Sequence, residues 1–154
     1  MLSLSKTETV SFDREVDTAV LPEHLAMCLR GVEAEDVHIV ANRVTFRGGV
    51  FRMVWNWNVL VPFGFGDLMV DSDNCEVRYT LSYRQLVVFG TGLVTIMLVF
   101  VLVLSAFRNL GILLALPLIW FFMVFGNLGI GFARFRSFVD RALASAPHLP
   151  ISQR

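Results

Sequence analysis

The stretch LVVFGTGLVTIMLVFVLVLSAF, from Leu86 to Phe107, carries no charged residue. After a short break a second apolar run follows, LGILLALPLIWFFMVFGNLGIGF, from Leu110 to Phe132. An α-helix needs about 20 apolar residues to cross the hydrocarbon core of a bilayer, and both runs are long enough. Two buried core helices are the alternative, but a chain of 154 residues has too little other structure to cover both runs on all sides. The runs therefore predict a transmembrane helical hairpin, with spans at about 86–107 and 110–131.

The overall composition also favours a membrane protein. Hydrophobic residues make up 55% and charged residues 17% of the chain, whereas soluble domains have about 45–50% and about 25%. The formal net charge is zero, so bulk electrostatics give no basis for a nucleic-acid partner. Cys28 and Cys75 are too few and too far apart for a disulfide scaffold or a zinc site, and two buried free thiols are expected.

The residues before the hairpin alternate in the way that is typical of half-buried strands. Every second residue is apolar or aromatic in CEVRYTLSYR, and similar patterns mark ETVSFDREV and DVHIVANRVTFRGG. The segment LPEHLAMCLRG predicts one short helix, with Pro22 in its first turn and Gly31 at its C-terminal cap. We therefore expect an α+β membrane protein: a small, mostly antiparallel β domain with one short helix at 1–84, the transmembrane helical hairpin at 85–132 and a short amphipathic C-terminal helix at 133–154.

One stretch of the β domain, VFRMVWNWNVLVPFGFGDLMV from Val50 to Val70, is rich in aromatic residues. Its first part alternates, so we expect a long strand whose Trp55 and Trp57 belong to the core. A proline ends this strand, and Phe63 and Phe65 then fall in a glycine-containing loop close to the bilayer. These two phenylalanines are candidates for contact with the membrane or with a partner.

The tail ARFRSFVDRALASAP also has an apolar face, which includes Phe135 and Phe138. The pattern is typical of an interfacial amphipathic helix, or of a second span that extends out of the bilayer. Phe135 and Phe138 are therefore further candidates for contact with the membrane or a partner.

The arginines predict the orientation of the hairpin. The link between the spans carries only Arg108, whereas five arginines flank the other end of the hairpin: Arg78, Arg84, Arg134, Arg136 and Arg141. Because arginines favour the cytoplasmic side, both termini are expected in the cytoplasm, and we expect a bacterial inner membrane. The tight turn at 108–111 makes the two helices antiparallel neighbours.

Small residues within the spans predict close helix contacts. They are Gly90 and Gly92 in the first span, and Gly126 and Gly129 in the second, which also contains Pro117 and Asn127. Small residues let helices approach each other closely. The sequence leaves open whether these positions pack the hairpin against itself or form an oligomer contact. The spans contain no acidic, basic or histidine side chain, which argues against a proton relay or a charged ion path.

The sequence contains no recognisable catalytic motif: neither a nucleophile elbow nor a phosphate-binding loop, a dinucleotide fingerprint or a zinc-protease helix. His24 and His38 are isolated histidines. The segment DLMVDSDNCE resembles the start of a calcium loop, but the required glycine and the final glutamate are missing, so an ordinary hairpin turn is expected. We therefore predict no catalytic residue, no metal ligand and no cofactor.

Three functions remain open on this basis. The favoured one is a non-catalytic integral membrane protein whose cytoplasmic β domain mediates protein interaction or assembles a larger membrane complex at the bilayer surface. Its expected partners are the lipid bilayer and copies of itself or other membrane proteins, but not nucleic acid. The alternative is a membrane-anchored protein that binds a lipid or other apolar ligand, which requires an enclosed apolar pocket. The third is a membrane enzyme, which would need clustered polar groups at the cytoplasmic interface, and the sequence shows no such cluster.

Overall fold

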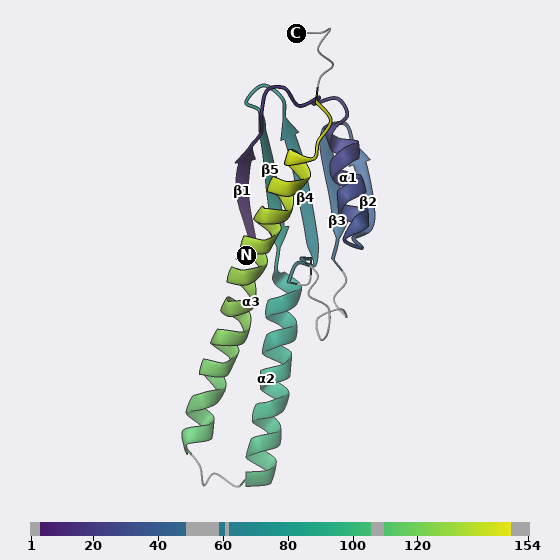
Figure 1. The fold of residues 1–154 in the computed structure, drawn as a ribbon. Helices are drawn as coiled ribbons and strands as arrows, with labels where there is room; N and C mark the ends of the chain where they lie inside the picture. The colour runs from purple at the N-terminus through teal and green to yellow at the C-terminus, as the bar shows by residue number, and fades with distance from the viewer. Residues whose placement is uncertain (1–3, 49–58, 61, 106–109, 149–154) are drawn as a thin grey trace.

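The computed structural model describes residues 4–48, 59, 60, 62–105 and 110–148, with the backbone alone for the helical residues 101–105 and 110–114. The elements follow in the order β1 (Ser5–Ser11), α1 (Leu21–Gly31), β2 (Glu35–Val40), β3 (Arg43–Arg47), β4 (Phe65–Asp71), β5 (Glu76–Ser82), α2 (Arg84–Ser105) and α3 (Leu110–Ala144). The protein is α+β, as predicted, with a five-stranded antiparallel sheet (Figure 1). Most of the predicted strand at 51–61, with Trp55 and Trp57, and the predicted turn at Arg108 lie outside the described residues.

The sheet consists of a four-stranded meander, β2 to β5, and the N-terminal strand β1, which lies beside β5. Strands β2 to β5 pair in chain order and β1 pairs with β5, which gives the order β1-β5-β4-β3-β2. At the β2–β3 turn Ala41 adopts a φ of 53°, and the Asn42 amide donates a hydrogen bond of 2.8 Å to the Val70 carbonyl. At the β4–β5 turn the Asp71 carboxylate accepts hydrogen bonds from Asn74. The aspartate-rich segment is thus a hairpin turn, as its composition predicts.

Helix α1 lies where the sequence predicts it, with a proline in its first turn. Its end differs from the expectation in one detail. Gly31 is the last helical residue, and the left-handed conformation is adopted by Glu33, with a φ of 63°. A glycine is therefore not what terminates this helix.

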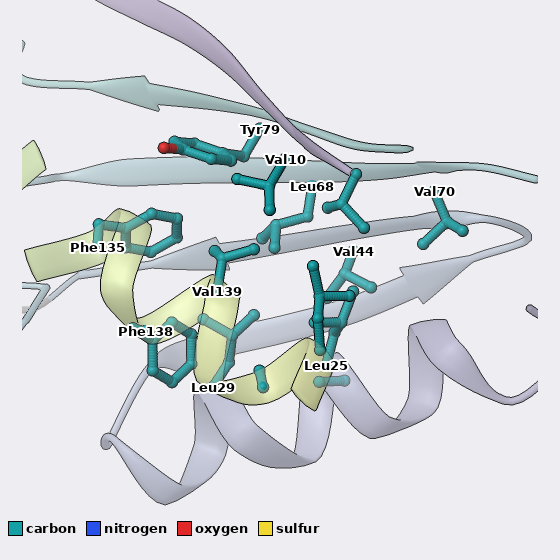
Figure 2. Packing of buried hydrophobic residues seen from close by; sticks show 14 of the residues in the cluster. Val10, Leu25, Leu29, Val44, Leu68, Val70, Tyr79, Phe135, Phe138 and Val139 are labelled. Atoms are coloured by element: carbon teal, nitrogen blue, oxygen red, sulfur yellow. The ribbon is translucent and has the colours of Figure 1, made fainter. Parts of the chain in front are cut away.

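Both α1 and the C-terminal half of α3 cover the same face of the sheet (Figure 1). Because side chains alternate across a strand, every second residue points towards these helices. Figure 2 shows the resulting core, in which β-branched and aromatic side chains of the strands meet leucines of α1 and aromatic residues of α3. The labelled members are Val10, Leu25, Leu29, Val44, Leu68, Val70, Tyr79, Phe135, Phe138 and Val139.

Helix α3 is a single helix of 35 residues that belongs to two parts of the molecule. It continues through Pro117 and through the predicted boundary at 132–133. Beyond that boundary Phe135, Val139 and Ala142 are buried against the sheet. Of the two alternatives for the tail, the structure therefore has the extended second helix, and its apolar face is covered by the β domain of the same chain.

The N-terminal half of α3 and helix α2 project together from one end of the sheet (Figure 1). They pack through a small cluster of Leu86, Val124 and Leu128. Elsewhere their large apolar side chains are exposed, among them Phe89, Phe100, Phe121 and Phe122. The segment Ala115–Ala144 is long and apolar enough to cross a membrane, by length and composition, whereas the part of α2 with described side chains, Arg84–Phe100, is shorter.

Candidate functional site

The junction between the sheet and the projecting helices is built around Phe135. Its ring lies 5.9 Å from the ring of Phe46, 5.2 Å from that of Tyr79 and 5.9 Å from that of Phe63, measured between centroids. Such centroid separations are those of favourable aromatic pairs. The junction is thus a filled aromatic cluster that ties three strand-side residues to one helix.

Two glycines make this close approach possible. A Cβ atom built at Gly66 would overlap the Phe46 ring, and one at Gly131 would overlap the ring of Pro62. Neither neighbour is a flexible chain that moves away easily. The loop before β4 therefore lies directly on the backbone of α3, which brings Phe63 into the core with 1% of its surface exposed.

A polar group borders the aromatic cluster. The Tyr79 hydroxyl donates a hydrogen bond of 2.6 Å to Glu8, and Glu8 forms an ion pair with Lys6. The Lys6 ammonium in turn lies 4.8 Å from the centre of the Phe132 ring on α3, which is a cation–π distance. Strand β1, strand β5 and α3 are thereby joined by one chain of contacts.

The pKa shifts show what this polar group can do. The hydrogen bonds from Lys6 and Tyr79 hold the pKa of the Glu8 carboxyl below its ordinary value. Burial, followed by the hydrogen bond to Glu8, raises the pKa of Tyr79 well above its ordinary value. Tyr79 therefore stays protonated as a donor and Glu8 stays ionised as an acceptor. This arrangement suits a structural contact and offers no general base near neutral pH.

A second polar contact joins α1 to the end of α3. The ring nitrogen Nε2 of His24 lies 3.0 Å from the carbonyl of Ala142, 3.3 Å from the Ser145 hydroxyl and 3.6 Å from the Cys28 sulfur. A cysteine beside a histidine invites comparison with a nucleophilic pair, but burial raises the pKa of the Cys28 thiol. A thiol with a raised pKa is a poor nucleophile, so this contact fastens the helix end and does not indicate catalysis.

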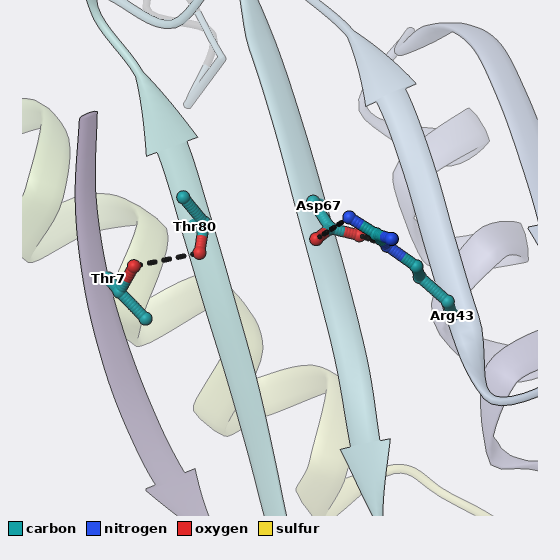
Figure 3. A network of polar contacts seen from close by, with 4 residues as sticks. All are labelled: Thr7, Arg43, Asp67 and Thr80. Carbon is teal, nitrogen blue, oxygen red and sulfur yellow. Dashed lines mark hydrogen bonds and ion pairs between the residues drawn. The ribbon is translucent and has the colours of Figure 1, made fainter. Parts of the chain in front are cut away.

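The other face of the sheet is uncovered by any described element. One row across it consists of Thr7, Thr80, Asp67, Thr45 and His38, and the next of Thr9, Arg78, Met69, Arg43 and Val40. Figure 3 shows two of the contacts on this face: a hydrogen bond of 2.8 Å between Thr7 and Thr80, and a paired contact of Arg43 with Asp67 at 2.6 and 2.8 Å. Phe65 and Met69 add exposed apolar surface, at 45% and 44% of their areas. We call these rows with Phe65 the open face.

The two edge strands of the described sheet are poor templates for pairing with another strand. Edge strand β1 carries an inward-pointing charge at Lys6, and edge strand β2 is interrupted by a register shift between Glu35 and His38, where Asp36 adopts a φ of 48°. Inward charges and bulges are known protections of sheet edges. Contact with a partner is therefore better accommodated by the open face than by strand addition.

The four aromatic residues predicted to contact a membrane or partner fall into two classes. Phe65 is exposed on the open face, as such a contact requires. Phe63, Phe135 and Phe138 are instead buried, so their assignment to an exposed surface is corrected to a packing role in the core. The sequence pattern identified them as one apolar face but could not say that the sheet covers it.

The small residues of the two predicted spans also separate into two classes. A Cβ atom at Gly90 would lie 3.1 Å from Val124, so Gly90 packs the two helices together. Beside it the Trp120 indole donates a hydrogen bond of 3.2 Å to Thr91. At Gly92, Gly126 and Gly129 a Cβ atom would meet nothing within 4 Å, and Pro117 and Asn127 are exposed. The Asn127 amide donates back to the Met123 carbonyl within its own helix.

The five arginines predicted to set the topology are all at the sheet end of the projecting helices or on the sheet itself. Arg84 is the first residue of α2 and is exposed, and Arg78 is exposed on the open face. On α3, Arg136 and Arg141 are exposed and Arg134 is partly buried.

Lys6, Glu8 and Tyr79 are the contact-forming residues that sequence reasoning missed. Only the two charged residues at inward positions of β1, Lys6 and Glu8, indicated them. Among the described residues no group of three or more histidine, cysteine or acidic side chains could hold a metal ion.

Comparison of the chain with protein-family models, curated proteins and solved structures finds no match. A proposal for the function therefore rests on the geometry described above.

Proposed function

We propose that the protein is a non-catalytic, two-span integral membrane protein whose β domain stands at the cytoplasmic surface and assembles with a protein partner through its open face. The observation that carries the proposal is the continuity of α3. One half of this helix exposes apolar side chains, and the other half is part of the core of the β domain.

The dimensions of the helices support a hairpin that crosses a bilayer. The 22 residues of α2 correspond to a length of about 33 Å, close to the ~30 Å of the hydrocarbon core. The 35 residues of α3 correspond to about 52 Å, which leaves roughly 20 Å for the β domain. The arginines at the sheet end favour a cytoplasmic β domain.

The rigid junction supports an assembly role. Because α3 is shared, the β domain cannot swing freely and must present its open face in a fixed direction relative to the bilayer. The membrane-anchored ligand binder is less well supported, since the space between sheet and helices is filled by Phe46, Phe63, Tyr79 and Phe135. The simplest protein partner for the open face is a second copy of the same chain, which would give a homo-oligomer.

Site-specific photo-crosslinking tests the open face with a matched pair of residues. Met69 lies on the open face and Met27 is exposed on α1, on the opposite layer. A photoreactive amino acid at position 69 is expected to yield crosslinked protein adducts in intact membranes, while the same probe at 27 yields few. Equal crosslinking at both positions, or crosslinking at 27 alone, would contradict the open face as the contact surface.

Cysteine labelling tests the orientation separately. In a background of Cys28→Ala and Cys75→Asn, a single cysteine replacing Asp73 should react with a membrane-impermeant reagent only after cells are opened. Asn is chosen at 75 because that position has a φ of 53°, which Asn tolerates. Labelling of position 73 from outside intact cells would overturn the cytoplasmic placement.

A further inference from the structure

An open hollow of about 500 Å³ lies along α3 where the helix passes from its exposed apolar half to the β domain. Five of its lining residues, Ile130, Ala133, Arg134, Ser137 and Arg141, come from α3, and Val59 forms the other wall. The α3 residues are spaced three, four, seven and eleven positions from Ile130, so they share one face of the helix. The hollow is therefore a groove along that face.

The chemistry of the groove changes along its length. At the end towards the hairpin, Ile130 is 57% exposed and continues the apolar surface of the projecting helices. At the other end, Arg134 and Arg141 are separated by two helical turns, about 10.5 Å along the axis. Ser137 lies between the two arginines, and its hydroxyl donates a hydrogen bond to the Ala133 carbonyl of the same helix. The small Ala133, next to Arg134, leaves room in the groove. The groove thus joins an apolar end to a doubly cationic end.

Arg141 is held in place at this cationic end. Its Nε atom donates a hydrogen bond of 3.1 Å to the carbonyl of Ser137, which fixes the side chain along the helix. Guanidinium groups bind phosphate oxygens through paired N–H donors and are well suited to phosphate recognition. No acidic residue is among the described residues that line the groove.

We infer that this groove binds an anionic membrane phospholipid, with the phosphate at Arg134 and Arg141 and an acyl chain along Ile130. The inference rests on the proposed function, because it requires α3 to cross the bilayer with its arginines at the membrane surface. Basic hollows at the cytoplasmic ends of membrane helices are sites for anionic headgroups. A lipid fits better than a soluble phosphate, because the groove opens onto apolar surface that an acyl chain would cover and a free phosphate would not.

Native mass spectrometry of the full chain tests the site. The protein is reconstituted in phosphatidylcholine nanodiscs that contain a minority of phosphatidylglycerol, and the lipids that remain bound after release are counted. We expect phosphatidylglycerol to be enriched over its share in the nanodisc. Arg134→Gln or Arg141→Gln should each reduce this enrichment roughly fivefold, and the double variant roughly 25-fold, from the contribution of one basic residue near an anionic surface.

Two further variants separate the groove from general charge. Arg136→Gln removes the same charge from the same helix, about 200° around its axis from Arg134, and should leave the enrichment unchanged. Ala133→Leu keeps both arginines but fills the groove, and should reduce the enrichment. An equal loss in Arg136→Gln, or no loss in Ala133→Leu, would overturn the site. Displacement of phosphatidylglycerol by millimolar inorganic phosphate would also overturn it, because the site would then bind phosphate without the lipid.

Carbonate extraction of each variant distinguishes this inference from the proposed function. If the wild-type chain is extracted from membranes by carbonate, the proposed membrane-spanning hairpin fails. If the chain resists extraction but shows no preference for phosphatidylglycerol, only the lipid site fails. Near-ultraviolet circular dichroism confirms that each variant keeps the packed aromatic core before its lipids are compared.

Discussion

The two halves of α3 use the same type of residue for opposite purposes. In the first half Phe121 contacts Phe122 edge-on and Phe125 at a tilt, and all three rings remain exposed. In the second half Phe135 and Phe138 are buried under the sheet. No described part of the chain covers the first set, whereas the sheet covers the second set. The comparison shows that aromatic content alone does not identify a membrane segment, because a sheet buries an apolar helix face as well as a lipid does.

The largest expected effect separates the two halves directly. Phe135→Ala should lower the free energy of unfolding of the β domain by about 3–5 kcal/mol, because it removes a ring from a filled core. Phe122→Ala, at a side chain that is 71% exposed, should change it little. Chemical denaturation in detergent, followed by near-ultraviolet circular dichroism, measures both. Equal losses in the two variants would show that the halves do not differ in this way.

The Tyr79–Glu8 contact comes next in size. Tyr79→Phe should cost about 1.5–3 kcal/mol, the range for a hydrogen bond to a charged group. The pH dependence has two arms. Because the pKa of Glu8 is lowered on folding, its stabilisation is present above the ordinary value of 4.5 and is lost as the pH falls through the folded value.

Tyr79 gives the second arm of the same profile. Its pKa is raised on folding, so its stabilisation is present below the ordinary value of 10.0 and is lost as the pH rises above it. Denaturation of the wild type at a series of pH values should therefore show a loss of stability above pH 10.0 that Tyr79→Phe lacks. Identical alkaline limbs in the two proteins would contradict this assignment.

A smaller effect is expected where α2 meets α3. Gly90→Leu should destabilise the helix pair by about 1–3 kcal/mol, because the added side chain is forced against Val124. Gly92→Leu, two residues away, meets open space and serves as the control. Unfolding in mixed detergent micelles reports the difference. A greater loss of stability in Gly92→Leu would contradict this packing, because it would mean that α2 contacts α3 through the face that carries Gly92.

The smallest effect concerns the hydrogen bond between α2 and α3. Thr91→Val removes the acceptor of the Trp120 indole and should cost about 0.6 kcal/mol, the average for such contacts between membrane helices. Thr95→Val removes a hydroxyl that donates to the Thr91 carbonyl of its own helix, and it should cost less. The same micelle assay compares them, and a larger loss at Thr95 would argue against the inter-helix bond.

Sequence reasoning predicted the α+β class, helix α1 and the hairpin turn at Asp71 because these depend on local patterns. It also identified Phe135 and Phe138 as one apolar helix face. It could not predict that the sheet covers these two side chains, since an apolar face has the same periodicity whether lipid or protein buries it. Phe63 was expected in an exposed loop. Its burial depends on Gly131, which lies in a helix nearly 70 residues later in the chain and lets that loop pack against the helix.

The partners of the polar contacts were equally beyond local patterns. Glu8 and Tyr79 are 71 residues apart and meet only through the register of β1 with β5. That register depends on which face of each strand is buried. Alternation within one strand predicts which side chains share a face, but not which strand pairs with it. The contact between Glu8 and Tyr79 therefore requires knowledge of the assembled sheet.

In the proposed arrangement, α3 passes without interruption from the bilayer into the core of the β domain. A spin-label scan along α3, in reconstituted membranes, tests it by comparing collisions with oxygen and with a water-soluble nickel reagent. Labels at Leu118, Phe122 and Phe125 should be reached by oxygen only, and labels at Phe135 and Val139 by neither reagent. Strong nickel accessibility at 118–125, or at 135 and 139 in labelled chains that keep the wild-type near-ultraviolet circular dichroism, would show that α3 does not join the membrane to the sheet.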